Sequence, residues 1–63
     1  MIYKEIVLGK IYEDEITGFV GVATAKAEYL DGMPNVRLTS TNTPEKPVEL
    51  WIPIARVMAR NPA

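Results

Sequence analysis

The chain has 63 residues, of which 48% are hydrophobic and 24% charged, and its seven basic and eight acidic residues give a formal net charge of −1. A chain of this length forms one domain, and we take residues 1–63 as that domain. Nucleic-acid binding rests mainly on cations placed against phosphates, so this near balance of charge argues against a dedicated nucleic-acid binder.

The first part of the chain contains two candidate strands separated by Gly9. Residues 2–8 alternate in part and have side chains typical of β-structure, so we expect either an edge strand or a loose arm. Residues 10–14 alternate in polarity and predict a strand, with Ile11 on one face and Tyr12 on the other.

A turn and a long strand are predicted over residues 14–32. Residues 15–18 have turn chemistry, and Gly18 can adopt a positive φ there. The alanines in residues 19–30 favour a helix, but the pattern has a period of two rather than about 3.6, which favours a strand. One face then carries Phe19, Gly21, Ala23, Ala25, Ala27 and Tyr29, and the other carries Val20, Val22, Thr24, Lys26, Glu28 and Leu30. Small residues along one face allow a strand to coil sharply, as a small barrel requires.

Two further strands are expected, with polar loops over residues 31–35 and 39–47 before them. Residues 35–40 direct Val36 and Leu38 to one face and Arg37 to the other. The strand over residues 48–52 has Val48, Leu50 and Ile52 on one face and Glu49 and Trp51 on the other, with either face inward.

Pro53 ends this strand and leaves two continuations open. Residues 54–57 are short enough for one 3₁₀ turn before a terminal strand over residues 57–60. Alternatively, Pro53 occupies the first turn of a short C-terminal helix. Short strands with turns at close spacing predict an all-β fold, a small five-stranded barrel.

One pattern of residues points to a family. Its members here are Asp14, Thr17, Gly18, Phe19 and Gly21 (D-x-x-T-G-F-x-G), then Tyr29, Leu30 and Gly32 (Y-L-x-G), and the late Trp51. The chain thereby resembles a family of very short phage and prophage proteins, and it is loosely similar to KOW domains. The resemblance implies an SH3-like β-barrel. Several small phage proteins are anti-defence factors that form oligomers and sequester nucleotide-derived immune signals, which is a class-level analogy for this chain.

Catalysis and metal binding find little support in the sequence. There is no cysteine and no histidine, which removes thiolate metal sites, disulfides and the commonest general base. Ser40 has no histidine to activate it, so we expect neither a catalytic residue nor a cofactor. The acidic residues 13–15 suggest either a Mg²⁺ or Ca²⁺ site or a solvated turn in which Asp14 accepts backbone N–H bonds. Their spacing lacks the pattern of a metal loop and favours the turn.

Four residues form the predicted ligand-binding site: Tyr29, Arg37, Trp51 and Arg56. An aromatic ring with a polar edge stacks on bases or lies at interfaces, and the planar fork of arginine suits phosphate. The alternatives are that the two aromatic rings cover the core and that the basic residues are dispersed in solvent. Lys26, Arg60, Tyr3 and Tyr12 are weaker candidates for the same site.

Oligomerisation is the one means left to stabilise so small a domain, and the apolar residues 51–58 are its expected interface. We expect a non-enzymatic phage accessory protein that oligomerises and binds a small anionic, nucleotide-type ligand. The alternatives are a module that docks a host or phage protein, and nucleic-acid binding of the KOW kind. No apolar run approaches the ~20 residues that span a bilayer, and the N-terminus lacks a secretory pattern, so the cytoplasm is the expected location.

Overall fold

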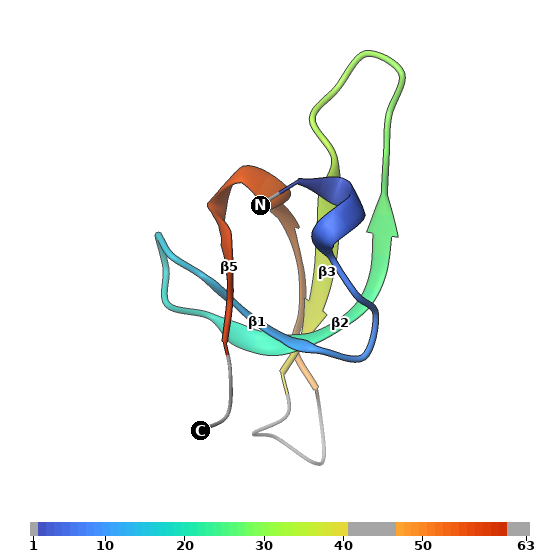
Figure 1. The fold of residues 1–63 in the computed structure, drawn as a ribbon. Coiled ribbons are helices and arrows are strands. Elements are labelled where there is room, and N and C mark those ends of the chain that lie inside the picture. The colour runs from blue at the N-terminus through green and yellow to red at the C-terminus, as the bar shows by residue number, and fades with distance from the viewer. Residues whose placement is uncertain (1, 41–46, 61–63) are drawn as a thin grey trace.

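The computed structural model describes residues 2–40 and 47–60, and the described part of the chain is all-β, as predicted (Figure 1). The elements are, in chain order, η1 (Tyr3–Glu5), β1 (Ile11–Asp14), β2 (Val20–Ala27), β3 (Asn35–Thr39), β4 (Glu49–Pro53), η2 (Ile54–Arg56) and β5 (Val57–Ala59). Both η elements are single 3₁₀ turns. The predicted loop over residues 39–47 falls largely on residues 41–46, which lie outside the described residues.

The strands form one five-stranded antiparallel sheet in the order β4-β3-β2-β1-β5. The sheet curls, so that η2 carries the chain from one edge strand, β4, to the other, β5 (Figure 1). Within the described residues no strand pairing joins β4 to β5, so the sheet is not closed into a barrel. Two edge strands therefore remain, which a closed barrel would not have.

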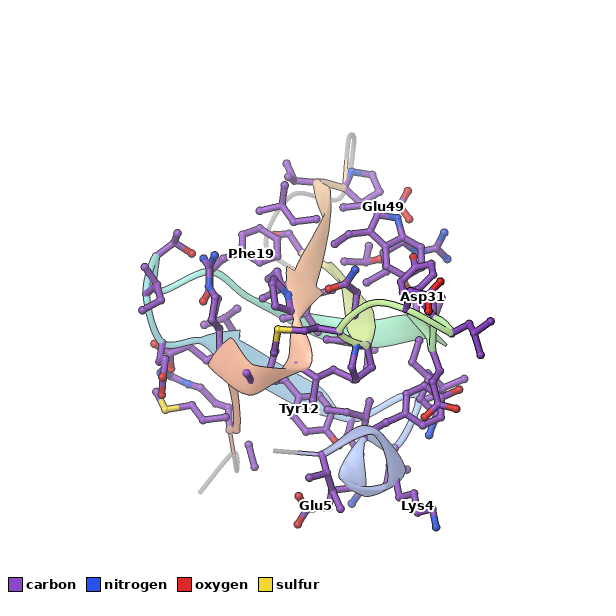
Figure 2. The ribbon with its side chains drawn as sticks, turned by 90° about the horizontal axis from the view of Figure 1, so that it is seen from above. Lys4, Glu5, Tyr12, Phe19, Asp31 and Glu49 are labelled. Atoms are coloured by element: carbon purple, nitrogen blue, oxygen red, sulfur yellow. The ribbon has the colours of Figure 1, made fainter. Side chains whose placement is uncertain are left out.

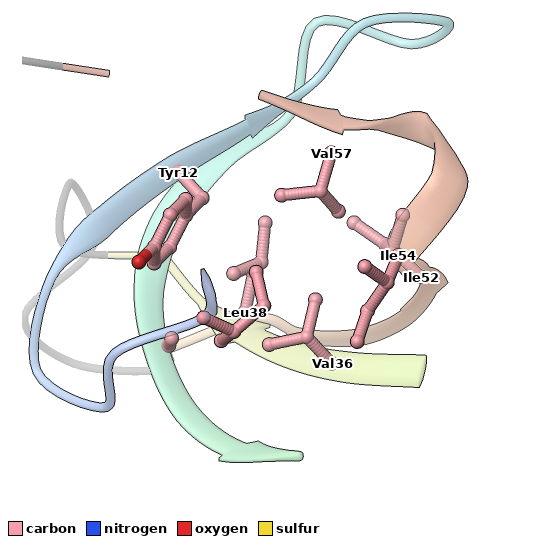
Figure 3. Close-up of a cluster of buried hydrophobic side chains, with 8 residues drawn as sticks. Tyr12, Val36, Leu38, Ile52, Ile54 and Val57 are labelled. Carbon is pink, nitrogen blue, oxygen red and sulfur yellow. The ribbon is translucent and has the colours of Figure 1, made fainter. Parts of the chain in front are cut away.

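The core lies inside the curve of the sheet (Figure 3). Its buried side chains come from both halves of the chain and are Ile6, Tyr12, Ala23, Val36, Leu38, Ile52, Ile54 and Val57. Tyr12 points inward, and its hydroxyl accepts a hydrogen bond from the Val7 N–H at 2.8 Å, so the ring is buried without an unpaired polar edge. Full burial of an aliphatic side chain such as Leu38 contributes about 1.5–3 kcal/mol, which makes this small cluster the main source of stability.

A β-bulge in β2 changes the faces that the sequence predicts. Ala23 pairs with Leu38, but the next pair on this side is Ala25 with Arg37, so Thr24 is an extra residue in β2. One extra residue shifts the alternation of side chains by one position. The predicted face therefore holds as far as Ala23, and the prediction that Ala25 and Ala27 continue that face is wrong.

The N-terminal residues 2–8 form neither the edge strand nor the loose arm that the sequence suggests. They contain η1 and then insert Ile6 into the core. The bulge is the physical reason, because it places Lys26 opposite the buried Val36 and so on the inner side of the sheet. There the Lys26 Nζ donates to the carbonyls of Tyr3 at 3.3 Å and Ile6 at 3.0 Å, and it lies 4.4 Å from the centroid of the Tyr3 ring.

The C-terminal part follows the first of the two predicted continuations. A 3₁₀ turn, η2, follows Pro53 and leads into the terminal strand β5, so the alternative of a short helix is wrong. The Ile54 N–H donates to the Pro34 carbonyl at 3.0 Å, which ties the start of η2 to the beginning of β3. Ile54 and Val57 both enter the core, so the turn is held by burial at each end.

Candidate functional site

The structure brings together two of the four residues predicted to bind a ligand. Arg37 in β3 and Trp51 in β4 are direct cross-strand partners. Tyr29 lies in the loop between β2 and β3, and Arg56 lies in η2. Among the described residues, no hydrogen bond or ion pair links either of these two to the Arg37–Trp51 pair.

Alternation along β3 explains why Arg37 faces outward. Its neighbours Val36 and Leu38 are both fully buried, so the side chain between them must point away from the core. Trp51 lies opposite Arg37 on the same outer face and is 51% exposed. The guanidinium carbon of Arg37 is 5.9 Å from the centroid of the Trp51 ring, within the range of a cation–π contact.

Two polar side chains hold Arg37 in place. Its Nε donates to Thr24 Oγ1 at 2.9 Å and lies 3.0 Å from Glu49 Oε2. The hydroxyls of Thr24 and Thr39 are 2.9 Å apart, which extends this network along β3. Thr24 is the extra residue of the β2 bulge, so the irregularity in β2 supplies the oxygen that Arg37 binds. We call Thr24, Arg37, Thr39, Glu49 and Trp51 together the Trp51 surface. In Figure 2, Glu49 of this surface lies on the opposite side of the molecule from Lys4 and Glu5 of η1.

Arg56 serves a different purpose. Its Nη2 lies 2.7 Å from Oδ2 of Asp14, and its Nε lies 3.2 Å from Oδ1 of the same carboxylate. Asp14 is only 1% exposed, and it also accepts bonds from the Ile16 N–H at 3.1 Å and the Thr17 hydroxyl at 2.7 Å. This is a two-pronged arginine–carboxylate pair, the geometry in which such pairs are strongest.

The Asp14–Arg56 pair shifts the pKa of each residue so that its charged form is favoured. The hydrogen bond from Arg56 holds the pKa of the Asp14 carboxyl well below its ordinary value, against the opposing effect of burial. The same bond raises the pKa of Arg56 above its ordinary value. Two of the donors that would meet a phosphate on Arg56 are therefore already occupied by a buried carboxylate.

The other basic candidates are also engaged within the chain. Lys26 binds carbonyls of residues 3 and 6, and Arg60 Nη1 lies 2.6 Å from Glu13 Oε1. The turn interpretation of residues 13–15 is confirmed in part, because the Ile16 N–H donates to Asp14. The expectation that this turn is solvated is wrong for Asp14, which ends β1 and is buried against Arg56. The described residues contain no group of three or more potential ligands placed to hold a metal ion. None of the helical turns in the described part of the chain is long and apolar enough to cross a membrane.

The β2–β3 loop is the most exposed apolar segment. It projects beyond the rest of the sheet (Figure 1), with Leu30 99% exposed and Tyr29 and Met33 also exposed. The other two tyrosine candidates face the interior, since Tyr12 is buried and Tyr3 packs against the core. Among the aromatic candidates, exposure thus leaves Tyr29 and Trp51 able to contact a partner.

No family model, curated protein or solved structure matches this chain. The resemblance to short phage proteins therefore stays a prediction. The residues that carry it have structural roles here: Asp14 and Thr17 build the β1–β2 turn, and Gly18 has a φ of 79° there. A Cβ at Gly21 would lie 2.6 Å from the Thr39 carbonyl oxygen, so that position admits only glycine without a shift of β3.

Proposed function

We propose that the protein is a non-catalytic interaction module that binds a protein partner through the Trp51 surface. The observation that carries this proposal is the Arg37–Trp51 pair, in which a half-exposed indole is held by an arginine. Tryptophan and arginine are the residue types that most often dominate binding energy at protein interfaces. Thr24 and Glu49 fix the arginine before any partner arrives, so less side-chain freedom is lost on binding.

The charge of the surface favours a protein over a polyanion. Glu49 lies 3.0 Å from the Arg37 Nε, so the positive charge is already balanced on the surface itself. A phosphate approaching Arg37 would also meet this carboxylate, at a cost from like charge. A partner that combines an apolar contact for the indole with neutral polar groups avoids that cost.

The test is capture from a lysate of cells that naturally make the protein. The immobilised chain is compared with Trp51→Ala and with Ile16→Ala, a matched loss of an exposed apolar side chain in the β1–β2 turn. We expect a specific partner to be retained by the wild type and by Ile16→Ala and lost by Trp51→Ala. Trp51 is the single tryptophan, so its emission should shift when the purified partner is added. Retention by Trp51→Ala without weakening would contradict the proposal.

A second candidate function is binding of a small nucleotide-type ligand, as in an anti-defence protein that sequesters an immune signal. The exposed indole beside Arg37 favours it, since bases stack on such rings. It ranks second because Arg37 and Arg56 both face carboxylates. Calorimetric titration with cyclic nucleotides and ADP-ribose derivatives tests it. Heat that disappears in Trp51→Ala supports this function, and no heat with any of these ligands removes it.

The assignment of the fold to the SH3-like barrels is part of the same proposal. The strand order β4-β3-β2-β1-β5 and the 3₁₀ turn between β4 and β5 support it. In that arrangement the two edge strands approach each other across η2, and the Trp51 surface lies on the outside of the curled sheet.

A further inference from the structure

We propose that β4 pairs with β4 of a second copy of this chain in an antiparallel arrangement centred on Leu50, which makes the protein a symmetric dimer. This inference does not depend on the Trp51 surface binding any partner. It rests on three features of the edge strand: the direction of its backbone groups, the positions of its prolines, and the exposure of its inner side chains.

Backbone hydrogen bonds define which groups of β4 point away from β3. The Ser40 N–H donates to the Val48 carbonyl at 2.8 Å, and the Ile54 N–H donates to the Pro34 carbonyl at 3.0 Å. Hydrogen-bonded and non-bonded pairs alternate along an antiparallel ladder, so residues 50 and 52 also bond β3. The N–H and C=O groups of Glu49 and Trp51 consequently point out of the sheet, where the described residues provide them with no strand partner.

The outward-pointing positions are symmetric about Leu50. They begin with Pro47, continue with Glu49 and Trp51, and end with Pro53. Antiparallel pairing centred on Leu50 sets Glu49 against the partner's Trp51, and Pro47 against the partner's Pro53. The N–H groups of Glu49 and Trp51 in each copy then donate to carbonyls of the partner strand. Each proline, which has no N–H to donate, lies opposite a proline of the partner. No donor on either edge is left unpaired.

The same register covers the apolar side chains that β4 leaves exposed on its inner side. Leu50 lies opposite the buried Leu38 and yet is 42% exposed, and Val48 is 47% exposed. In the dimer Leu50 would face the partner's Leu50, and Val48 would face the partner's Ile52. The buried row that now ends at Leu38 would continue through Leu50 into the second copy.

The size of the domain gives the reason for choosing a second copy as the occupant. Domains of about 60 residues bury only ~60% of the surface of the unfolded chain and often need a disulfide, a metal or an oligomer. The chain has no cysteine, and its described residues hold no metal-ligand group. An edge that is complementary to itself supplies the third solution.

A disulfide trap tests both the dimer and its register. In a non-hydrogen-bonded pair the Cα atoms are about 4.5 Å apart, within the range that a disulfide spans. Because the chain has no cysteine, Leu50→Cys introduces a single thiol. We expect Leu50→Cys to form a covalent dimer under mild oxidation at low protein concentration. Val48→Cys on the same face is the matched control, because the two copies of residue 48 would lie about 13 Å apart.

Two outcomes of the trap overturn the proposal. If Leu50→Cys cross-links no faster than Ile16→Cys in the distant β1–β2 turn, β4 is not the interface. If Val48→Cys cross-links as fast as Leu50→Cys, the proposed register is wrong.

A proline scan provides a test without covalent chemistry. Glu49→Pro removes an outward donor but no bond to β3, whereas Glu49→Ala removes only the side chain. Sedimentation equilibrium should show a concentration-dependent dimer for the wild type and Glu49→Ala. For Glu49→Pro the dissociation constant should rise about ten- to a hundredfold, from the loss of two hydrogen bonds.

The fold of each variant is checked by thermal unfolding at a dilution where all are monomeric. Equal dissociation constants for Glu49→Pro and Glu49→Ala would overturn the proposal, as would a wild type that stays monomeric up to millimolar concentration. Neither measurement involves a partner protein, so failure of the dimer and failure of the proposed function are separate results.

Discussion

Arg56 Nη2 lies 2.7 Å from Asp14 Oδ2, and this contact joins two residues that are 42 positions apart in the chain. It fixes η2 to the β1–β2 turn, and the Glu15 N–H adds a bond to the Arg56 carbonyl at 2.9 Å. The first strand and the C-terminal part of the sheet are thus held together by a charge pair with a buried carboxylate as well as by the β1–β5 ladder.

We expect Asp14→Asn to lower the melting temperature strongly. The substitution keeps the size of the side chain but replaces the buried carboxylate that accepts two bonds from Arg56 with a neutral amide, and charge-assisted two-pronged bonds are stronger than neutral ones. The control is Glu13→Gln, which removes the more exposed pair with Arg60 and should cost only about 0–1 kcal/mol. Equal melting temperatures for the two variants would show that the Asp14–Arg56 pair contributes no special stability.

The same pair predicts that the stability of the wild type and that of Asp14→Asn depend differently on pH in acid. The pKa of Asp14 is lower in the folded protein than its ordinary value of 3.8, so the unfolded chain binds this proton more readily. The stabilising contribution is complete above pH ~4 and is lost as the pH falls toward the lower folded value. Unfolding by urea from pH 6 to pH 2 should therefore show a steeper loss for the wild type than for Asp14→Asn. Parallel curves would contradict the prediction.

Gly21→Ala should destabilise the protein by about 1–3 kcal/mol, the usual range for forcing an extra carbon into a packed site. The added Cβ would lie 2.6 Å from the Thr39 carbonyl oxygen, which is backbone and cannot rotate away. Gly32→Ala is a suitable control, because its Cβ would meet Tyr29 at an ordinary 3.5 Å. Chemical denaturation of the two variants measures the difference, and similar midpoints would mean that β3 shifts freely.

Lys26→Met should release η1 from the sheet. The substitution removes the donor that binds the carbonyls of Tyr3 and Ile6, and a hydrogen bond from a charged group contributes about 1.5–3 kcal/mol. Amide hydrogen exchange should accelerate at Glu5 and Ile6, whose N–H groups bond within η1. Lys10→Met, at an exposed position, should leave these rates unchanged. Unchanged protection in Lys26→Met would show that Ile6 alone holds the segment.

Alternation along the chain predicted most of the sheet. The strands around Tyr12 and Val36 were recognisable because buried side chains alternate there with partly exposed ones. In β4 the apolar residues alternate in the sequence, but among them only Ile52 is buried. The period of two also decided correctly between strand and helix for β2, despite its alanines. The 3₁₀ turn after Pro53 was one of two options, and proline alone could not select between them.

The bulge at Thr24 could not be predicted from alternation, because an extra residue leaves the polarity pattern locally intact. Its consequences were missed with it: Lys26 points inward, and residues 2–8 contain the 3₁₀ turn Tyr3–Glu5 instead of a strand. In the candidate site, the Arg37–Trp51 pair follows from strand order, whereas the partner of Arg56 depends on a contact between distant segments. One signal in the sequence pointed to burial of Asp14: it lies two positions after Tyr12 in the same strand and therefore on the same, buried face.

The separation between Asp14 and Arg56 also bears on how the chain is made. A carboxylate cannot be buried cheaply before its cation exists, so β1 and β2 cannot adopt their final packing while residue 56 is still unsynthesised. The burial of Asp14 is therefore completed only when η2 is in place, so the β1–β2 turn and η2 reach their final packing together.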